Sequence, residues 1–539
     1  MIGNILKKSI LAAAAVSISA CTANYLEINS NPYEVSRDQM EADGYGLSAA
    51  LNGMAGVVIS TERNTAQFTD NLLGCTQGGY FGDTGSWATT ISQFDATDDW
   101  TGVLLASDQV IPLFYSNYTD LKRITDDPVP LAIADVLKVA VMHRVADTYG
   151  PIPYTQIGAD GQIAVPYDSE QTVYETMIRE LGDAATTLYE YSSSSLPATA
   201  DYVYGGNVAK WARFANSLRM RLAMRIINVD RDFATEAIKA AVDTENGAGV
   251  FVDNGDNATF AVFATYGNPM YSSAWYNPAQ ISGHQCLTGG ESHASADITS
   301  YMNAYNDPRR PAYFIDSEWP GQQYCGVRRG IQRPAINEAG HKYSGINFTA
   351  QSPLVWMNAA EVAFLKAEAE AVYGIDIPGG TAKDFYEKGI SLSFQQYGVT
   401  GAESYISSNV QNVTVSYTDP WTEDNENTRV EPVSGVPGVM WQDDDKVQQR
   451  IITQKWIANW IIGHEAWSDY RRTGYPVLFP ASPEGNRSGG VVDSSRGARR
   501  MPYPQAEYTN NPYMSDAVSM LRGQDTMGTD LWWAKKTND

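Results

Sequence analysis

Cysteine is scarce in this chain of 539 residues, which carries it only at positions 21, 75, 286 and 325. No pair has the C-x-x-C spacing, so the sequence indicates neither a zinc site nor a redox motif. An exported chain can form one disulfide. Cys286 and Cys325 are the favoured pair because both lie in glycine-rich sequence, and at least one further thiol then stays free.

Basic residues are also in short supply. The chain has 38 Lys and Arg against 62 Asp and Glu, which gives a formal net charge of −24 at pH 7. A surface of this sign repels nucleic acid and anionic lipid head groups, and it disfavours polyanionic substrates. We therefore expect no nucleic-acid partner, and we interpret most of these charges, including the acidic run 443–445, as solvated surface.

Motifs of the common catalytic machineries are absent from the sequence. It has no G-x-S-x-G, no H-E-x-x-H and no Walker loop, and its five histidines show no metal-ligand spacing. We therefore predict that the protein is not an enzyme. Two of the 62 acidic residues could lie at the spacing that a glycosidase active site needs. A secreted glycoside hydrolase is therefore the alternative.

Long apolar runs are missing beyond the first 20 residues. Two lysines precede the run 10–20, which is shorter than the roughly 20 residues that a membrane span needs. The run ends in I-S-A-C (18–21), which resembles a bacterial lipobox. We predict a signal peptide over 1–20 and a lipidated Cys21 whose acyl chains, palmitate among them, tether the chain to a membrane. The alternative is an ordinary signal peptide with a chance cysteine.

Apolar and aromatic residues, in contrast, are plentiful. Apolar residues make up 43% of the chain and aromatic residues 11%, which is enough for a folded core. The 32 tyrosines and 13 tryptophans exceed what packing usually needs and favour a surface that binds by stacking. The length indicates one large compact body or two closely packed lobes.

Helical periodicity dominates two parts of the chain. The central element is a helix over 128–149 with one apolar face, and a Gly-Pro stop after it fixes the positions of Tyr149 and Tyr154. The next helix is expected to take Asp168 or Ser169 as its N-cap. Further helices are expected over 38–59, 106–125, 207–223, 232–243, 358–373, 381–397, 448–462 and 465–472.

The spacing of the helices predicts a mainly α fold. Successive helix pairs of about 35–45 residues are typical of tetratricopeptide-like helical hairpins. We expect this scaffold over about 38–245 and 356–475. A loop-rich second lobe with short strands is expected over about 246–355 and 400–447, where we expect ligand to bind. Together they form one domain over 21–539.

A set of motifs follows in a fixed order along the chain. They are I-S-A-C (18–21) with L-E-I-N (26–29), D-T-Y-G-P-I-P-Y (147–154), P-Y-D-S (166–169), K-W-A-R-F-A-N-S-L (210–218), N-A-A-E-V-A-F-L-K-A-E (358–368), Q-K-W (454–456), E-A-W-S-D-Y-R-R-T-G-Y-P (465–476) and R-M-P-Y-P (500–504). The ordered set resembles the SusD/RagB family of Bacteroidota outer-membrane lipoproteins, and the resemblance covers essentially the mature chain.

The resemblance implies a SusD-like fold and a role in nutrient uptake. Such a protein is a cell-surface lipoprotein that acts as the lid of a SusC-like TonB-dependent transporter, captures nutrient fragments and delivers them into the barrel. Most members bind oligosaccharides and some bind peptides, so an oligosaccharide is favoured and an oligopeptide is the alternative. A third hypothesis is a scaffold that binds only its partner protein.

Ligand contacts are expected from aromatic side chains in the loops, because sugar C–H faces stack on such rings while hydroxyl groups need polar neighbours. The candidates are Tyr80, Phe81 and Trp87 in a first loop and Tyr271, Trp275 and Tyr276 in a second, with Asp83 and Asn277 as polar partners. The alternative for each is packing inside its own loop, and the same rings also suit peptides. The motif residues expected to pack in the scaffold instead are Tyr149, Tyr154, Trp211, Trp467 and Arg471.

One short acidic segment fits a cation. Asp253 and Asp256 flank a glycine turn in D-N-G-D-N (253–257), and hard cations such as calcium prefer clustered oxygens. The segment lacks the late glutamate of an EF-hand, so a solvated turn is the favoured alternative. We expect no required cofactor and name calcium as the one candidate ion.

Overall fold

The computed structural model describes residues 44–84, 90–158, 164–263, 267–274, 292–331, 339–421 and 430–535. The expected signal peptide and Cys21 lie outside these ranges. Helices make up most of the described chain and short strands accompany them, so the predicted mainly α fold is confirmed. None of the helices in these ranges has both the length and the apolar character that a membrane crossing requires.

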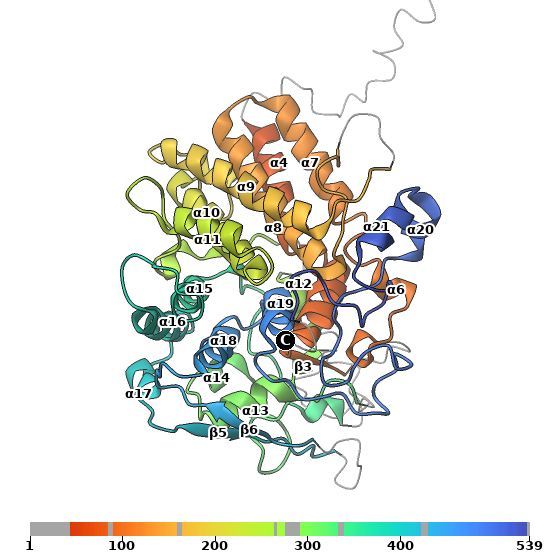
Figure 1. Ribbon diagram of the computed structural model, residues 1–539, viewed down its shortest axis with the longest axis vertical. Helices are drawn as coiled ribbons and strands as arrows, with labels where there is room; N and C mark the ends of the chain where they lie inside the picture. Colours follow the sequence, from red (N-terminus) through yellow and green to blue (C-terminus); the bar gives the residue numbers. More distant parts are fainter. Residues whose placement is uncertain are drawn as a thin grey trace, which may run out of the picture.

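Helices of the scaffold pack in pairs. The pairs are α4 (Tyr45–Val58) with α7 (Ile111–Ile124), α8 (Pro128–Tyr149) with α9 (Glu170–Glu190), α10 (Val208–Ile226) with α11 (Arg231–Val242), and α15 (Ala359–Ala371) with α16 (Ala382–Gln396). Later in the chain come α18 (Val447–Ala458), which packs on α15 and α16, and α19 (Gly463–Thr473). In Figure 1 the pairs form an arc from α4 and α7 at the top, past α9–α11, to α15 and α16 at the left. The predicted tetratricopeptide-like hairpins are therefore present.

The central helix α8 has the predicted bounds but not the predicted exposure. The side chain of Asp127 accepts a hydrogen bond from the N–H of Val129, and Pro128 occupies the first turn, where its missing N–H costs nothing. The sequence predicts one apolar face, whereas α8 is buried around almost its whole circumference. The reason is that α4, α7, α9, α10 and α19 all pack against it, so its polar residues Arg144 and Asp147 also lie inside.

The start of α9 decides between the two expected caps. Ser169 is the N-cap, and its hydroxyl accepts from the N–H of Thr172 at 3.2 Å. Asp168 instead holds the segment that leaves α8, because its carboxylate accepts from the N–H of Thr155 at 2.7 Å. Two neighbouring polar residues thus fix a helix start and the loop before it.

Helix α19 and the loop segment after it fasten the end of α8 and the turn that follows it. Arg471 donates to the carbonyl oxygen of Asp147 at 2.6 Å, and Arg500 donates to that of Tyr149 at 2.7 Å. The hydroxyl of Tyr503 donates to the carbonyl oxygen of Pro151 at 2.6 Å. The two arginine bonds satisfy carbonyl groups in the last turn of α8, which have no partner inside the helix, and the tyrosine bond holds the turn that follows. The motif residues Tyr149, Tyr154, Trp211, Trp467 and Arg471 are all buried, as predicted.

The loop-rich part contains short antiparallel ladders. The pairs are β1 (Phe81–Asp83) with β3 (Ser292–Ala294), β2 (Ala258–Phe260) with β4 (Leu354–Met357), and β5 (Asn412–Val415) with β6 (Val433–Pro437). Helices α12 (Pro269–Ala274), α13 (Ala296–Ala304), α14 (Arg310–Tyr313) and α17 (Ala402–Ile406) lie among them. The sequence predicts no helix at these four positions, because the helices are short and none has a long apolar stripe.

Candidate ligand-binding site

The first predicted loop turns its aromatic rings inward. Tyr80 stacks on Trp456 with 5.6 Å between ring centroids, and its hydroxyl donates to the Trp456 carbonyl oxygen at 2.6 Å. Phe81 meets Trp460 edge-on at 5.7 Å, and both Tyr80 and Phe81 are fully buried. The expectation that these two rings face solvent is therefore wrong. Their burial against the end of α18 removes two large apolar surfaces from water and anchors the loop.

The other candidates divide into two groups. Asp83 is buried, and its carboxylate accepts from the Thr90 hydroxyl at 2.5 Å, so it also belongs to the interior. Tyr271 is half-buried and meets Phe348 edge-on at 5.8 Å. The candidates that lie outside the described residues are Trp87, Trp275, Tyr276 and Asn277. Cys286 lies outside them too, and Cys325 is a buried free thiol.

The carboxylates of the predicted calcium site have protein partners. Asp253 caps a short turn by accepting from the N–H of Gly255 at 2.8 Å. Asp256 is buried and lies 3.1 Å from the guanidinium of Arg213, while its second oxygen accepts from the N–H of Val252 at 2.9 Å. Within the described ranges, no three residues among His, Cys, Asp and Glu form a group that could hold a metal ion. Calcium binding stays a prediction.

Pairing of β1 with β3 joins the described residues at the start of the first predicted loop to those that follow the second. Asp83, at the end of β1, pairs with Ser292, where the described chain resumes after the second loop. Segments 325–327 and 343–344 extend this ladder by backbone hydrogen bonds, and we refer to the four segments together as the strand frame. The hydrogen bonds that extend it are Val327 N–H to Ala294 O (2.9 Å) and Ser344 N–H to Cys325 O (2.8 Å).

Two glycines allow the strands of this frame to approach so closely. A Cβ atom at Gly82 would lie 1.7 Å from Cγ1 of Val327, and a Cβ atom at Gly326 would lie 2.0 Å from the carbonyl oxygen of Ser295. Any other residue at either position requires its neighbours to move, and at Gly326 the neighbour is backbone.

An aromatic platform, formed by Trp319, Tyr343, Tyr417 and Trp421, lies on the strand frame. Its rings surround Cys325 and Val327 in a small apolar cluster separate from the main core. Trp319 meets Tyr343 edge-on at 5.8 Å, and the ammonium of Lys342 lies 4.8 Å from the Trp319 ring centroid. Both indoles are partly exposed, whereas Tyr343 is fully buried. The platform thus presents two tryptophans for stacking, above a fixed tyrosine.

Polar groups below the platform are incompletely satisfied. Asp419 Oδ1 accepts from the hydroxyl of Tyr343 at 2.7 Å and from the N–H of Trp421 at 2.9 Å. Its other oxygen, Oδ2, and the Nε1 of Trp319 are buried and have no hydrogen-bond partner within the described part of the chain. Burial raises the pKa of Asp419. Buried polar atoms without partners mark a place where a ligand hydroxyl or an ordered water can complete the hydrogen bonding.

Neither tryptophan of the platform is among the ligand-binding residues predicted from the sequence. Each stands next to a proline, in Trp319-Pro320 and Pro420-Trp421, inside sequence without helical or strand periodicity. A large aromatic residue beside proline in a loop has a restricted backbone and a side chain with few partners nearby in the chain. That pattern is a signal that could have singled them out.

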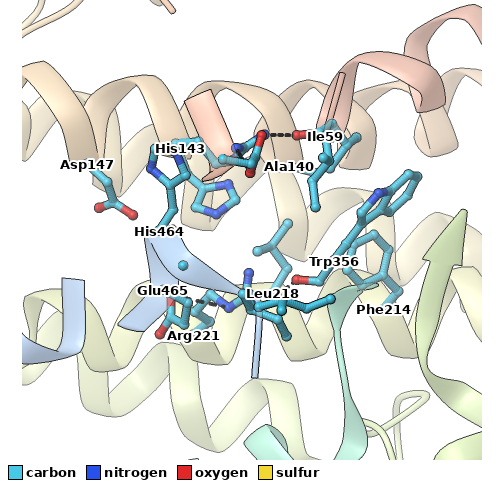
Figure 2. Close-up of a pocket in the computed structure, with 16 residues that line it drawn as sticks. Ile59, Ala140, His143, Asp147, Phe214, Leu218, Arg221, Trp356, His464 and Glu465 are labelled. Atoms are coloured by element: carbon cyan, nitrogen blue, oxygen red, sulfur yellow. Dashed lines mark hydrogen bonds and ion pairs between the residues drawn. The ribbon is translucent and has the colours of Figure 1, made fainter. Parts of the chain in front are cut away.

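A cavity inside the scaffold is too small for a sugar. Its volume is about 30 Å³, and Figure 2 shows His143 and His464 on one side and Trp356 and Phe214 on the other. One water needs about 10–15 Å³ by this measure, so the cavity has room for two or three waters at most. It is a packing defect among polar residues and not a ligand site.

Beside this cavity, buried ion pairs join the helices of the scaffold. Arg221 binds Glu361 through two contacts of 2.7 Å, which links α10 to α15. Glu465 of α19 contacts Arg225 of α10, and it lies 3.0 Å from Lys455 of α18. Buried charged residues with shifted pKa values often mark active sites. Here each of these residues has a partner of opposite charge in the protein, so a structural role is favoured.

Burial of His464 makes the stability of the protein depend on pH. Burial, with a further contribution from Arg144, lowers the pKa of His464 to about 4, from an ordinary value near 6.5. As pH falls from 6.5 towards 4, the unfolded chain binds a proton that the folded chain does not, so the free energy of unfolding decreases. We expect a loss of about 2 kcal/mol from this residue between pH 7.5 and pH 5.

The measurement is chemical denaturation across that pH range for the wild type and for His464→Gln. The glutamine amide can still donate to the Thr69 carbonyl oxygen, which lies 2.8 Å from the histidine Nε2. The variant should show a smaller decrease, whatever its stability at pH 7.5. If the free energy of unfolding decreases equally with pH in both proteins, His464 is not buried and neutral in the folded chain.

Comparison with known proteins gives a consistent result over almost the whole chain. The family model described as "Susd and RagB outer membrane lipoprotein" matches residues 27–534. A SusD homologue from Bacteroides uniformis is 50% identical, with a TM-score of 0.86 over 92% of this chain and 100% of that one. A SusD homologue from Bacteroides thetaiotaomicron is 35% identical, with a TM-score of 0.79 over 91% and 99%. A chitin-binding SusD homologue from Flavobacterium johnsoniae is 33% identical, with a TM-score of 0.79 over 90% and 98%. No curated protein matches the sequence.

Proposed function

The chain belongs to the SusD-like family of outer membrane lipoproteins, and from that premise we propose that it captures oligosaccharides and passes them on unaltered. Members of this family are carbohydrate-binding nutrient-capture proteins and not enzymes. The homologue from Flavobacterium johnsoniae that binds chitin supports a glycan as the ligand class. An oligopeptide ligand is the alternative that the test below must separate.

The observation that carries the proposal is the aromatic platform. Trp319 and Trp421 are partly exposed side chains on a frame that also holds the stems of both predicted loops. A sugar ring can stack on an indole, and its hydroxyl groups can bond to Asp419 or to the ammonium of Lys342. This combination of apolar faces with a few polar groups is typical of small-ligand sites.

The expected affinity is modest. A stacked ring contributes about 0.5–1.5 kcal/mol beyond the area that it buries. Two such rings with a few hydrogen bonds correspond to a Kd of about 1 μM to 1 mM. Weak binding suits a protein that must release its cargo to a transporter.

The membrane anchor and the partner complete the proposal. Acyl chains on Cys21 would hold the protein on the outer membrane with the platform facing the exterior. A SusC-like TonB-dependent transporter would be its partner, with this chain as the lid. Purification of the complex from its native membrane, followed by mass spectrometry, would identify the partner and any ligand that it carries.

The test of the platform is a binding series. Trp319→Ala and Trp421→Ala should each weaken oligosaccharide binding by about tenfold, because each removes a stacking face worth about 1.4 kcal/mol. Isothermal titration calorimetry with neutral oligosaccharides, chito-oligosaccharides among them, measures the effect. Tyr191→Ala is the matched control, since this aromatic side chain is exposed on the scaffold at the end of α9.

Two results would overturn the proposal. Unchanged glycan binding in both tryptophan variants would remove the platform from the site. Saturable binding of oligopeptides with no binding of any glycan would replace the ligand class.

A further inference from the structure

A second hollow lies in the helical scaffold, between α15 and α16. Its volume is about 390 Å³, which falls in the range of about 300–1,000 Å³ that small-molecule sites occupy. Buried apolar side chains form its wall: Phe251, Ala359, Ala363 and Phe385. Figure 1 shows α15 and α16 at the left edge of the molecule, whereas β3, which belongs to the strand frame, lies nearer its centre. We refer to this space as the α15–α16 hollow.

Lys366 of α15 lines the hollow without a counter-charge. Its ammonium lies 5.4 Å from the ring centroid of Phe385, and its side chain is partly buried. No described carboxylate lies within ion-pair distance of it. Burial alone lowers the pKa of Lys366, and no neighbouring acid raises it again. A desolvated cation without a partner is costly, so its presence calls for an anion.

Other charges around the hollow leave it positive. Lys388 of α16 is exposed and contributes a second ammonium to the lining. Asp384 contributes the carboxylate of the lining, and its Oδ2 accepts from the N–H of Thr381 at 2.9 Å and from the Thr381 hydroxyl at 2.7 Å. The lining therefore carries a formal charge of +1 in a chain whose net charge is −24.

We propose that the α15–α16 hollow binds a small organic anion that has an apolar body and one carboxylate group. The apolar body would rest against Phe251 and Phe385, and the carboxylate would pair with Lys366. An ion pair next to an aromatic face, out of water, is stronger than the same pair at the surface. A neutral sugar would leave Lys366 unpaired, so this site takes a ligand class different from that of the aromatic platform.

The test uses 3-phenylpropanoate and its neutral amide as probes with the full chain. We expect the acid to bind at least about tenfold more tightly than the amide, and Lys366→Met to remove that difference. Lys383→Met is the matched control, because this lysine lies on the same helix α16 as Lys388, is exposed and pairs with Glu387 at 3.7 Å. Ligand-observed NMR titration gives both affinities, and inorganic phosphate as competitor shows whether the apolar body matters.

Three further measurements keep the test independent of folding and of the glycan site. Val252→Asp places a carboxylate on the exposed rim of the hollow and should abolish binding of the acid. Lys366→Met should melt at or above the wild-type temperature, since it removes an unpaired charge, and Trp319→Ala should bind the acid unchanged. Equal affinity for acid and amide, full binding by Lys366→Met, or equally tight binding of phosphate would each overturn the proposal.

Discussion

Glu465→Gln is expected to lower the free energy of unfolding by about 3–5 kcal/mol, the usual cost of removing one partner from a buried ion pair. Glu465 is almost fully buried and faces Arg225, Lys455 and Arg221, the last at 3.5 Å. Burial by itself would raise the pKa of Glu465, but these three cations overcome it and hold the pKa well below the usual value. The amide keeps the shape and loses the charge, so three cations lose their shared partner.

Chemical denaturation at pH 7.5 measures this loss. Asp120→Asn is the matched control, because it makes the same carboxylate-to-amide change in an exposed pair with Arg123. A surface pair of this kind contributes about 0–1 kcal/mol. If both variants lose the same small amount, the buried ion pairs do not hold the scaffold together.

The low pKa of Glu465 also sets how acid acts on the protein. A carboxyl group with a depressed folded-state pKa stabilises the fold above its unfolded-state pKa, near 4.5, and this contribution is lost as pH falls below that value. Glu465→Gln should therefore lose less stability than the wild type between pH 5 and pH 3. If the free energy of unfolding falls equally in the two proteins between pH 5 and pH 3, the pairing of Glu465 with these cations is contradicted.

Gly326→Ala is expected to destabilise the protein by about 3 kcal/mol and to abolish ligand binding at the aromatic platform. The new Cβ atom would lie 2.0 Å from the carbonyl oxygen and 2.1 Å from the carbonyl carbon of Ser295. Both are backbone atoms of the residue that directly follows β3, so rotation of a side chain cannot relieve the overlap. The segment that carries Cys325 and Val327 must move, and the platform rests on those two residues.

Gly380→Ala serves as the control for this change. Its Cβ atom would meet only side-chain atoms, the nearest of them Asp384 Cβ at 3.3 Å, in an exposed turn. Thermal unfolding and oligosaccharide titration are measured for both variants. The comparison separates disruption of the strand frame from the effect that any glycine-to-alanine change has on stability. Full glycan binding by Gly326→Ala would show that the frame does not position the site.

The helices could be predicted because their signals are local. The start of α8 at Pro128 and the cap of α9 at Ser169 follow from a few neighbouring residues, and the structure has both. The burial of α8 on all sides could not be predicted in the same way. It depends on α19, which follows α8 by more than 300 residues and covers a face that carries Arg144 and Asp147.

The candidate site was predicted less well, for a physical reason. A ring in a loop can turn towards solvent or towards the core, and the choice for Tyr80 depends on Trp456, which is distant in sequence. The strand frame, likewise, joins segments near 82, 293, 326 and 344, whose pairing no local pattern indicates. The two loops could be named as candidates from the sequence. The pairing of the strands beside them, β1 and β3, could be found only from the structure.

The central claim is that this chain binds an oligosaccharide on the aromatic platform and does not alter it. The most direct measurement is equilibrium binding of defined oligosaccharides to the purified chain, followed by mass spectrometry of the recovered ligand. The account predicts saturable binding with a Kd of about 1 μM to 1 mM and a ligand whose mass is unchanged after long incubation. Shortened fragments, or no saturable binding of any oligosaccharide, would contradict it.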